Sequence, residues 1–86
     1  MPTIATFLGF RVVIYPNDHR PAHVHVMGRG GEAVFELNCP DGPPHLRENY
    51  GFARKDTKQM LRELDALLAQ LCTDWDHIHG TASRRF

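Results

Sequence analysis

The segment AHVHVMGRGGEAVFELN, residues 22–38, decides the fold that we expect for this chain. Apolar and polar side chains alternate on both sides of a glycine-rich centre at residues 28–31. Alternation with a period of two is typical of strands with one buried face, and a short glycine-rich interruption is typical of a tight turn. The segment therefore predicts a β-hairpin.

Two turn positions fit this hairpin. A turn at Arg29–Gly30 pairs His23 with Glu36, whereas a turn at Gly30–Gly31 pairs His25 with Glu36. Both place His23, His25 and Glu36 on one polar face, because a two-residue shift in pairing leaves every side chain on the same side of the sheet. The opposite face is apolar in both cases.

The segments that flank the hairpin extend the sheet. Residues 10–15, FRVVIY, alternate in the same way and predict a strand, which ends at the proline-bounded turn PNDHRP. Alternation places Arg11 and Val13 on the face that carries the histidines. The segment CPDGPP favours a loop, and residues 45–52 allow a short edge strand. We therefore expect an antiparallel sheet of three to four strands.

A single amphipathic helix is the clearest element of the sequence. Apolar residues recur every three or four positions from Arg54 to His79, and Gly80 follows as a C-terminal stop. We expect an α+β fold in which this one long C-terminal helix packs on the apolar face of the sheet. The prediction is a single domain over residues 1–80 and a frayed tail over residues 81–86.

Two features predict contact with a partner protein. The helix would be about 35–40 Å long at 1.5 Å per residue, which is long for so small a sheet. Val13 and Val34 add apolar surface to the polar face, and Trp75 lies on the apolar stripe of the helix. We expect these three residues to form a partner interface, in a homo-oligomer or in a hetero-complex with a small companion protein.

The composition argues against several classes of protein. The 86 residues carry 10 basic and 10 acidic side chains, and zero net charge does not indicate a sequence-independent nucleic-acid binder, although a local basic patch stays open. No apolar run approaches the roughly 18 residues of a membrane span, and the N-terminus is unlike a signal peptide. With Cys39 and Cys72 far apart and no CxxC spacing, we expect reduced thiols and a cytoplasmic, microbial protein.

Three histidines, His19, His23 and His25, fall within seven residues. Imidazole is the commonest protein ligand of transition metals, and zinc takes three or four ligands of this kind, often with a carboxylate. Glu36 on the neighbouring strand would supply a carboxylate. Asp18, which we expect mainly to close the turn through its own side chain, is another source. One hypothesis is therefore a zinc site made by the three histidines and Glu36, although the spacing matches no recognised zinc motif.

Two other hypotheses explain the same histidines. In a structural role, they line a half-exposed sheet face and hydrogen-bond to Glu32 and Glu36. In a catalytic role, His23 or His25 acts as a general base that Glu36 orients, while Arg11 holds a phosphate group. Small RNases need little more than such a base, an acid and a cation.

Three motifs carry a resemblance to a known family: GFRVVIYPNDHRPAHVHV, the glycine-rich turn, and LCTDWDHIHG near the end of the helix. The most specific residues are Asp18, His19, Pro21, His23 and His25. With them the chain resembles, over residues 2–80, the small bacterial family catalogued as domain of unknown function 4160, while Ala22 and Val24 depart from its pattern. The resemblance implies a compact α+β domain, often encoded beside a second small protein in an arrangement similar to toxin–antitoxin pairs.

The resemblance and the expected interface together predict a component of a toxin–antitoxin-like two-protein module that acts through protein–protein contact. An alternative is a metal-independent RNase or phosphodiesterase that uses His19, His23 and His25. A second alternative is a metal-binding module built on the same histidines.

Overall fold

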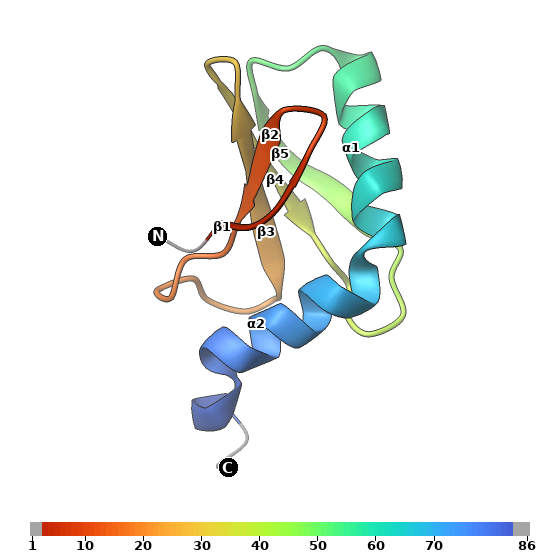
Figure 1. Ribbon diagram of the computed structural model, residues 1–86. Coiled ribbons are helices and arrows are strands. Elements are labelled where there is room, and N and C mark those ends of the chain that lie inside the picture. Colours follow the sequence, from red (N-terminus) through yellow and green to blue (C-terminus); the bar gives the residue numbers. More distant parts are fainter. Residues whose placement is uncertain (1–2, 84–86) are drawn as a thin grey trace.

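The computed structural model describes residues 3–83, with side chains described up to His79 (Figure 1). Its elements are β1 (Thr3–Phe7), β2 (Phe10–Val13), β3 (His23–Gly28), β4 (Gly31–Glu36), β5 (His45–Tyr50), α1 (Arg54–Ala66) and α2 (Leu68–Ser83). The strands form one antiparallel sheet in the order β1-β2-β3-β4-β5, so each strand pairs with its neighbours in the sequence. Figure 1 shows α1 running beside the sheet and α2, at an angle to α1, crossing the lower end of the sheet. The expected α+β class is confirmed.

The β3–β4 hairpin has the first of the two predicted registers. His23 pairs with Glu36 and Gly28 with Gly31, so Arg29–Gly30 is the turn. Both turn residues have positive φ, 50° for Arg29 and 79° for Gly30. Two positive φ values in a two-residue turn match the right-handed twist of the strands that the turn joins.

The core lies between the apolar face of the sheet and the two helices. The sheet contributes Phe10, Val12, Ile14, Ala22, Val24, Val26, Ala33, Phe35 and Leu37, and the helices contribute Met60, Leu64, Leu68, Leu71 and Trp75. These are the apolar positions of the alternating strands and of the helical stripe. The other face of the sheet carries the histidines and their carboxylate neighbours, and Trp75 of α2 contacts His23 at the start of β3.

Within residues 3–83 the sheet has five strands, so the expectation of three to four was too low. The additional strand is β1, which pairs with β2 through a two-residue turn at Leu8–Gly9. Leu8 has a φ of 52°, a conformation that is costly for a branched side chain and that turn rules do not assign to leucine. The short edge strand allowed at residues 45–52 is present as β5.

Within residues 54–83 the predicted C-terminal helix is two helices, not one. Leu67 leaves helical geometry with φ −100° and ψ 7°, and α2 begins at Leu68. The change of direction keeps Leu68, Leu71 and Trp75 in the core, where a straight helix would carry them past the end of the sheet. Because α2 continues to Ser83, the first three residues of the predicted tail are helical, while residues 84–86 lie outside the described part.

The prediction of reduced cysteines is wrong, because Cys39 and Cys72 form a disulfide bond across 33 residues of sequence. The loop between β4 and β5 folds back onto α2 and brings the two sulfur atoms together. The same loop approaches the start of α2 at Gly42, where a side chain would collide with Leu68. The sequence has no cysteine-spacing motif that predicts this disulfide bond.

The residues expected at a partner interface are buried within this single chain. Val13 and Val34 expose 0% and 6% of their surface, and Trp75 exposes 1%. They therefore present little surface to a partner in this conformation. Within residues 3–83, no helix combines the length and hydropathy that a membrane span requires.

Candidate functional site

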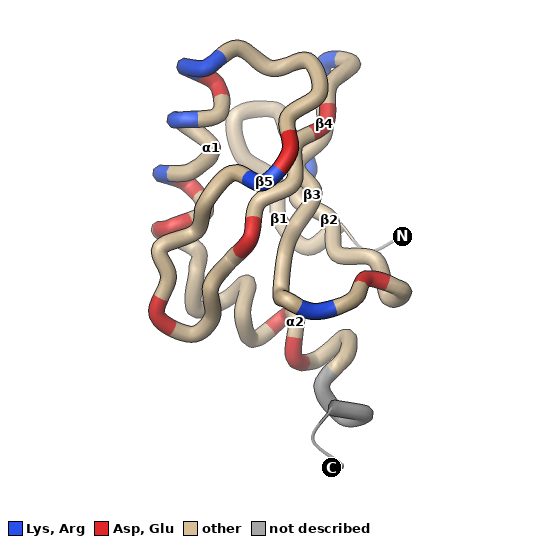
Figure 2. The backbone as a smooth tube through the Cα atoms, turned by 180° about the vertical axis from the view of Figure 1, so that it is seen from behind, with Lys and Arg blue, Asp and Glu red and all other residues tan. Residues whose placement is uncertain are grey.

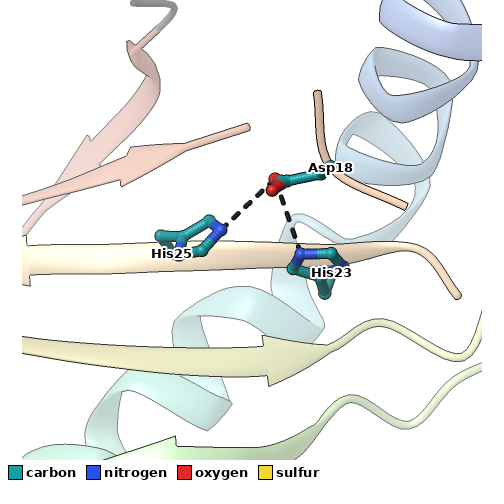
Figure 3. A group of neighbouring side chains, drawn as sticks. All are labelled: Asp18, His23 and His25. Carbon is teal, nitrogen blue, oxygen red and sulfur yellow. Dashed lines mark hydrogen bonds and ion pairs between the residues drawn. The ribbon is translucent and has the colours of Figure 1, made fainter. Parts of the chain in front are cut away.

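Asp18 and two of the histidines meet at one point on the polar side of the sheet. The carboxylate oxygen Oδ2 of Asp18 lies 3.2 Å from Nε2 of His25 and 3.5 Å from Nε2 of His23 (Figure 3). His23 and His25 are two residues apart on β3, so their side chains leave the same face. Asp18 comes from the loop between β2 and β3, which folds over that face.

The loop holds Asp18 in place through its own backbone. The Asp18 N–H donates to the carbonyl of Tyr15 at 3.0 Å, and the Tyr15 N–H donates to Oδ2 of Asp18 at 3.1 Å. Aspartate commonly closes turns in this way, as the sequence predicted for this position. The ring of Tyr15 packs edge-on against His25 with centroids 4.8 Å apart, which fixes the loop against β3.

The Nδ1 atoms of His23 and His25 also have hydrogen-bond partners. Nδ1 of His23 donates to the carbonyl oxygen of Pro21 at 2.9 Å, and Nδ1 of His25 lies 3.0 Å from Oε2 of Glu32. Hydrogen bonds of this kind fix the orientation and tautomer of a histidine ring. Both Nε2 atoms are therefore held toward the Asp18 carboxylate.

The arrangement favours a positive centre between Asp18 and the histidines. When Nδ1 of His23 carries a proton for Pro21, the neutral ring has a lone pair at Nε2, and that lone pair faces a carboxylate oxygen. Two acceptors that face each other repel. A proton on Nε2 relieves the repulsion, and so does a cation bound by Asp18, His23 and His25 together.

The spacing of these atoms suits a transition-metal ion. One oxygen and two nitrogen atoms, from Asp18, His23 and His25, all lie within 4.8 Å of one another. Ligands about 2.1 Å from a tetrahedral zinc ion lie about 3.4 Å apart. The two distances from the histidine Nε2 atoms to Asp18 Oδ2, 3.2 and 3.5 Å, bracket this value.

The site forms part of the wall of an open pocket of about 570 Å³. Its lining residues are Asn17, Asp18, His19, Arg20, Pro21, His23, His25, Val34, Glu36, Arg47 and Glu48. Three carboxylates and two guanidinium groups line the pocket, and Figure 2 shows acidic positions on β4, on β5 and in the β2–β3 loop. A ligand in this pocket can approach the histidines from solvent.

Helix α2 supports the site from the core side. Trp75 packs against the ring of His23 with centroids 5.4 Å apart, and His79 stacks on Trp75 at 3.9 Å. Nε2 of His79 lies 3.3 Å from the carbonyl oxygen of Tyr15, at the start of the loop that carries Asp18. Helix α2 thus contacts both the β2–β3 loop, through His79, and strand β3, through Trp75.

The structure groups the predicted residues differently from the proposed zinc set. His23 and His25 come together as expected, but their carboxylate partner is Asp18 and not Glu36. Glu36 lines the same pocket and lies 3.4 Å from Nε2 of His45 and 4.0 Å from Nε of Arg47. His19 is exposed at the pocket wall and is not among the three clustered ligands.

The structure places Arg11 outside the site, whereas Glu32 and Tyr15 contact His25. Arg11 pairs with Met27, away from His23, and does not line the pocket. The contact between His25 and Glu32 agrees with the hydrogen bond considered for a structural role. The contribution of Tyr15 was missed, since the path of the loop determines which ring covers His25.

Comparison with known proteins identifies the family but no characterised relative. No curated protein and no solved structure matches the chain. Residues 9–76 match the family model described as Domain of unknown function (DUF4160), and this match covers most of the chain, including Asp18, His23, His25 and both cysteines. The chain therefore belongs to the family Domain of unknown function (DUF4160).

Proposed function

We propose that this chain binds a divalent transition-metal ion through Asp18, His23 and His25, and that the ion keeps an open position for a water or substrate molecule in the adjacent pocket. The observation that carries the proposal is the convergence of three ligand atoms, with a hydrogen-bond partner behind each histidine. Carboxylate and imidazole ligands suit zinc and other first-row metals.

The number of protein ligands argues for a reactive site and not for a purely structural one. Structural zinc sites are closed by four protein ligands, whereas catalytic sites have three and retain an open position for water or substrate. Three ligands beside an open pocket fit the second pattern. A metal bound here would activate water for hydrolysis, which makes a small metal-dependent hydrolase the form of the function that we favour.

Binding should be measured first with Zn²⁺, by competition with a chromophoric chelator and by isothermal titration. We expect one equivalent per chain in the wild type, and loss of at least tenfold in affinity for Asp18→Ala and for His23→Gln. His19→Gln and Glu36→Gln serve as matched controls, because both residues line the pocket without belonging to the cluster. Circular dichroism should show that each variant is folded.

Two results would overturn the proposal. The first is a folded wild-type chain that binds no zinc, nickel, manganese or iron(II). The second is binding that survives Asp18→Ala but is lost with His19→Gln or Glu36→Gln, since this would favour the ligand set suggested by the sequence.

A second candidate at the same residues is a metal-independent RNase or phosphodiesterase. It is supported by the position of His23 between the Pro21 carbonyl and the Asp18 carboxylate, since a histidine oriented by a carboxylate is a common general acid or base. Cleavage of RNA that persists in EDTA and disappears with His23→Gln would favour this candidate. Cleavage that depends on added metal would favour the first.

A role in a toxin–antitoxin-like pair is also a proposal, supported by the family resemblance and by the two sheet edges, β1 and β5. Strand edges offer backbone groups for pairing with another chain. Light scattering of the chain alone and with its genomic neighbour tests this role. A chain that stays monomeric and binds no neighbour would contradict it.

A further inference from the structure

The Cys39–Cys72 disulfide lies beside a second pocket that adjoins the proposed metal site. This pocket, about 570 Å³ in volume, is lined by Arg20, Pro21, Ala22, Asn38 and Cys39. Arg20 and Pro21 line the first pocket as well. One short segment of the β2–β3 loop therefore separates the disulfide from Asp18 and the histidines.

The loop provides the first connection between disulfide and metal site. The carbonyl of Pro21 accepts the hydrogen bond from Nδ1 of His23, and it belongs to the segment that faces Cys39 across the second pocket. The Leu37 N–H donates to the Ala22 carbonyl at 3.0 Å, which fastens the two segments together. A shift of the Cys39 segment would therefore disturb the hydrogen bond that holds His23.

Helix α2 provides the second connection. Cys72 precedes Trp75 by three residues, so both lie on the same side of the helix. Trp75 packs on His23, and His79 contacts the backbone of Tyr15. The disulfide thus links the β4–β5 loop to the helix that supports the histidine strand.

The two cysteine residues differ in their exposure. Cys39 is exposed at the surface, whereas Cys72 is partly buried. Which sulfur a thiolate attacks depends on access, so attack should occur at Cys39. Arg20 lines the pocket beside Cys39, and its positive charge favours an anionic thiol such as glutathione.

We propose that the Cys39–Cys72 disulfide is a thiol-exchange site for small anionic thiols, and that its opening weakens metal binding at Asp18, His23 and His25. In the first step a thiolate attacks Sγ of Cys39, the S–S bond breaks, and its electron pair leaves on Sγ of Cys72, which takes a proton from water. A second thiolate then attacks the mixed disulfide and releases Cys39 as a thiolate, which is also protonated. Two thiols are oxidised to one disulfide, and the protein disulfide is reduced to two thiols.

The regulatory half of this inference rests on the proposed metal site. The exchange half does not, because it follows from the exposure of Cys39 and from the pocket beside it. The two halves are therefore tested by separate measurements.

Exchange is tested on the oxidised chain by brief exposure to glutathione, quenching with iodoacetamide before the second step is complete, and peptide mapping. We expect glutathione on Cys39 and the alkyl group on Cys72. Arg20→Gln should slow exchange with glutathione about two- to threefold at 0.1 M salt relative to exchange with neutral 2-mercaptoethanol. Glutathione found on Cys72, or an exchange rate that rises in low urea in step with the unfolded fraction, would overturn this half.

Regulation is tested by zinc affinity of the oxidised chain and of the Cys39→Ser/Cys72→Ser variant, which lacks thiols that would bind zinc themselves. We expect the variant to bind zinc about tenfold more weakly, with near-UV circular dichroism of Trp75 confirming that it is folded. Equal affinities would overturn the regulation and leave the metal site standing. A folded, oxidised chain that binds no metal would instead overturn the proposed function. Thiol exchange at Cys39 would still be tested by peptide mapping.

If the Cys39→Ser/Cys72→Ser variant does not fold, a second measurement tests the regulation of metal binding. The oxidised chain is then loaded with zinc, treated with one equivalent of glutathione and followed with a chromophoric chelator. Zinc release in step with glutathionylation of Cys39 supports the regulation. Full glutathionylation without zinc release contradicts it.

Discussion

Glu32→Gln should weaken zinc binding about tenfold, although Glu32 is not one of the three ligands. Oε2 of Glu32 lies 3.0 Å from Nδ1 of His25, and a carboxylate in this position orients the ring and makes Nε2 a better ligand. Outer partners of this kind contribute about 10- to 100-fold in metal affinity. Because the Glu32 side chain is 42% exposed, we expect the lower end of the range, or about 1.4 kcal/mol.

The matched control for this prediction is Glu48→Gln. The Glu48 side chain is 40% exposed and lines the same pocket, but its partners are Arg47 and Tyr50 and not a histidine. Both substitutions remove one negative charge, so their difference isolates the hydrogen bond to His25. The assay is competition with a chromophoric chelator at fixed pH and ionic strength.

Two outcomes would refute this reasoning. One is an affinity for Glu32→Gln within twofold of the wild type. The other is an equal loss for Glu48→Gln, because a general effect of charge would then explain both. The metal-free variants should differ in unfolding free energy by less than about 1 kcal/mol, since exposed pairs of charged groups contribute little.

Three further predictions concern stability and titration. Serine at both Cys39 and Cys72 should lower the free energy of unfolding by about 3–4 kcal/mol, because the disulfide bond joins residues that are 33 apart in the sequence. Urea titration measures this loss, and a loss under about 1 kcal/mol would contradict the chain-entropy argument. Leu8→Gly should raise the free energy of unfolding by about 0.5–1 kcal/mol, because Leu8 has a φ of 52° and is 48% exposed, and a lower melting temperature would show that the leucine is not strained. The hydrogen bond to Glu48 raises the pKa of Tyr50, so Glu48→Gln should move its phenolate absorbance transition to lower pH, and an unchanged transition would count against the bond. Because the folded pKa is the higher one, this bond stabilises the fold below the ordinary tyrosine pKa of about 10 and is lost as the pH rises through the folded pKa.

The hairpin and its polar face were predictable because alternation alone determines which side chains share a face. His23 and His25 had to lie together in any register related by two residues. The register itself depended on the turn, and a sequence with three glycines among residues 28–31 does not choose between Arg29–Gly30 and Gly30–Gly31.

The elements that the sequence analysis missed depend on contacts between distant segments. The turn before β2 has leucine at positive φ, a choice that local preferences do not favour, so β1 was not recognised. The apolar stripe continues across Leu67 without a proline or glycine, and the bend there keeps the stripe on the core. The Cys39–Cys72 pairing likewise depends on how the β4–β5 loop returns to α2.

The candidate site was predictable in its histidines but not in its carboxylate. Glu36 was the natural choice because strand pairing brings it to the same face as His23. Asp18 was expected mainly to close a turn, and it does so by bonding to Tyr15. Its second role, toward the histidines, follows from the fold of the loop over β3, which no local pattern specifies.

The most direct test of the metal site is X-ray absorption spectroscopy of the zinc-loaded chain. We expect one zinc per chain, with two imidazole nitrogens and one carboxylate oxygen at about 2.0–2.2 Å and the remaining ligands from water. Asp18→Ala should remove the stoichiometric zinc. A first shell with sulfur ligands, with fewer than two imidazoles, or with no stoichiometric zinc in the folded wild type would contradict the account.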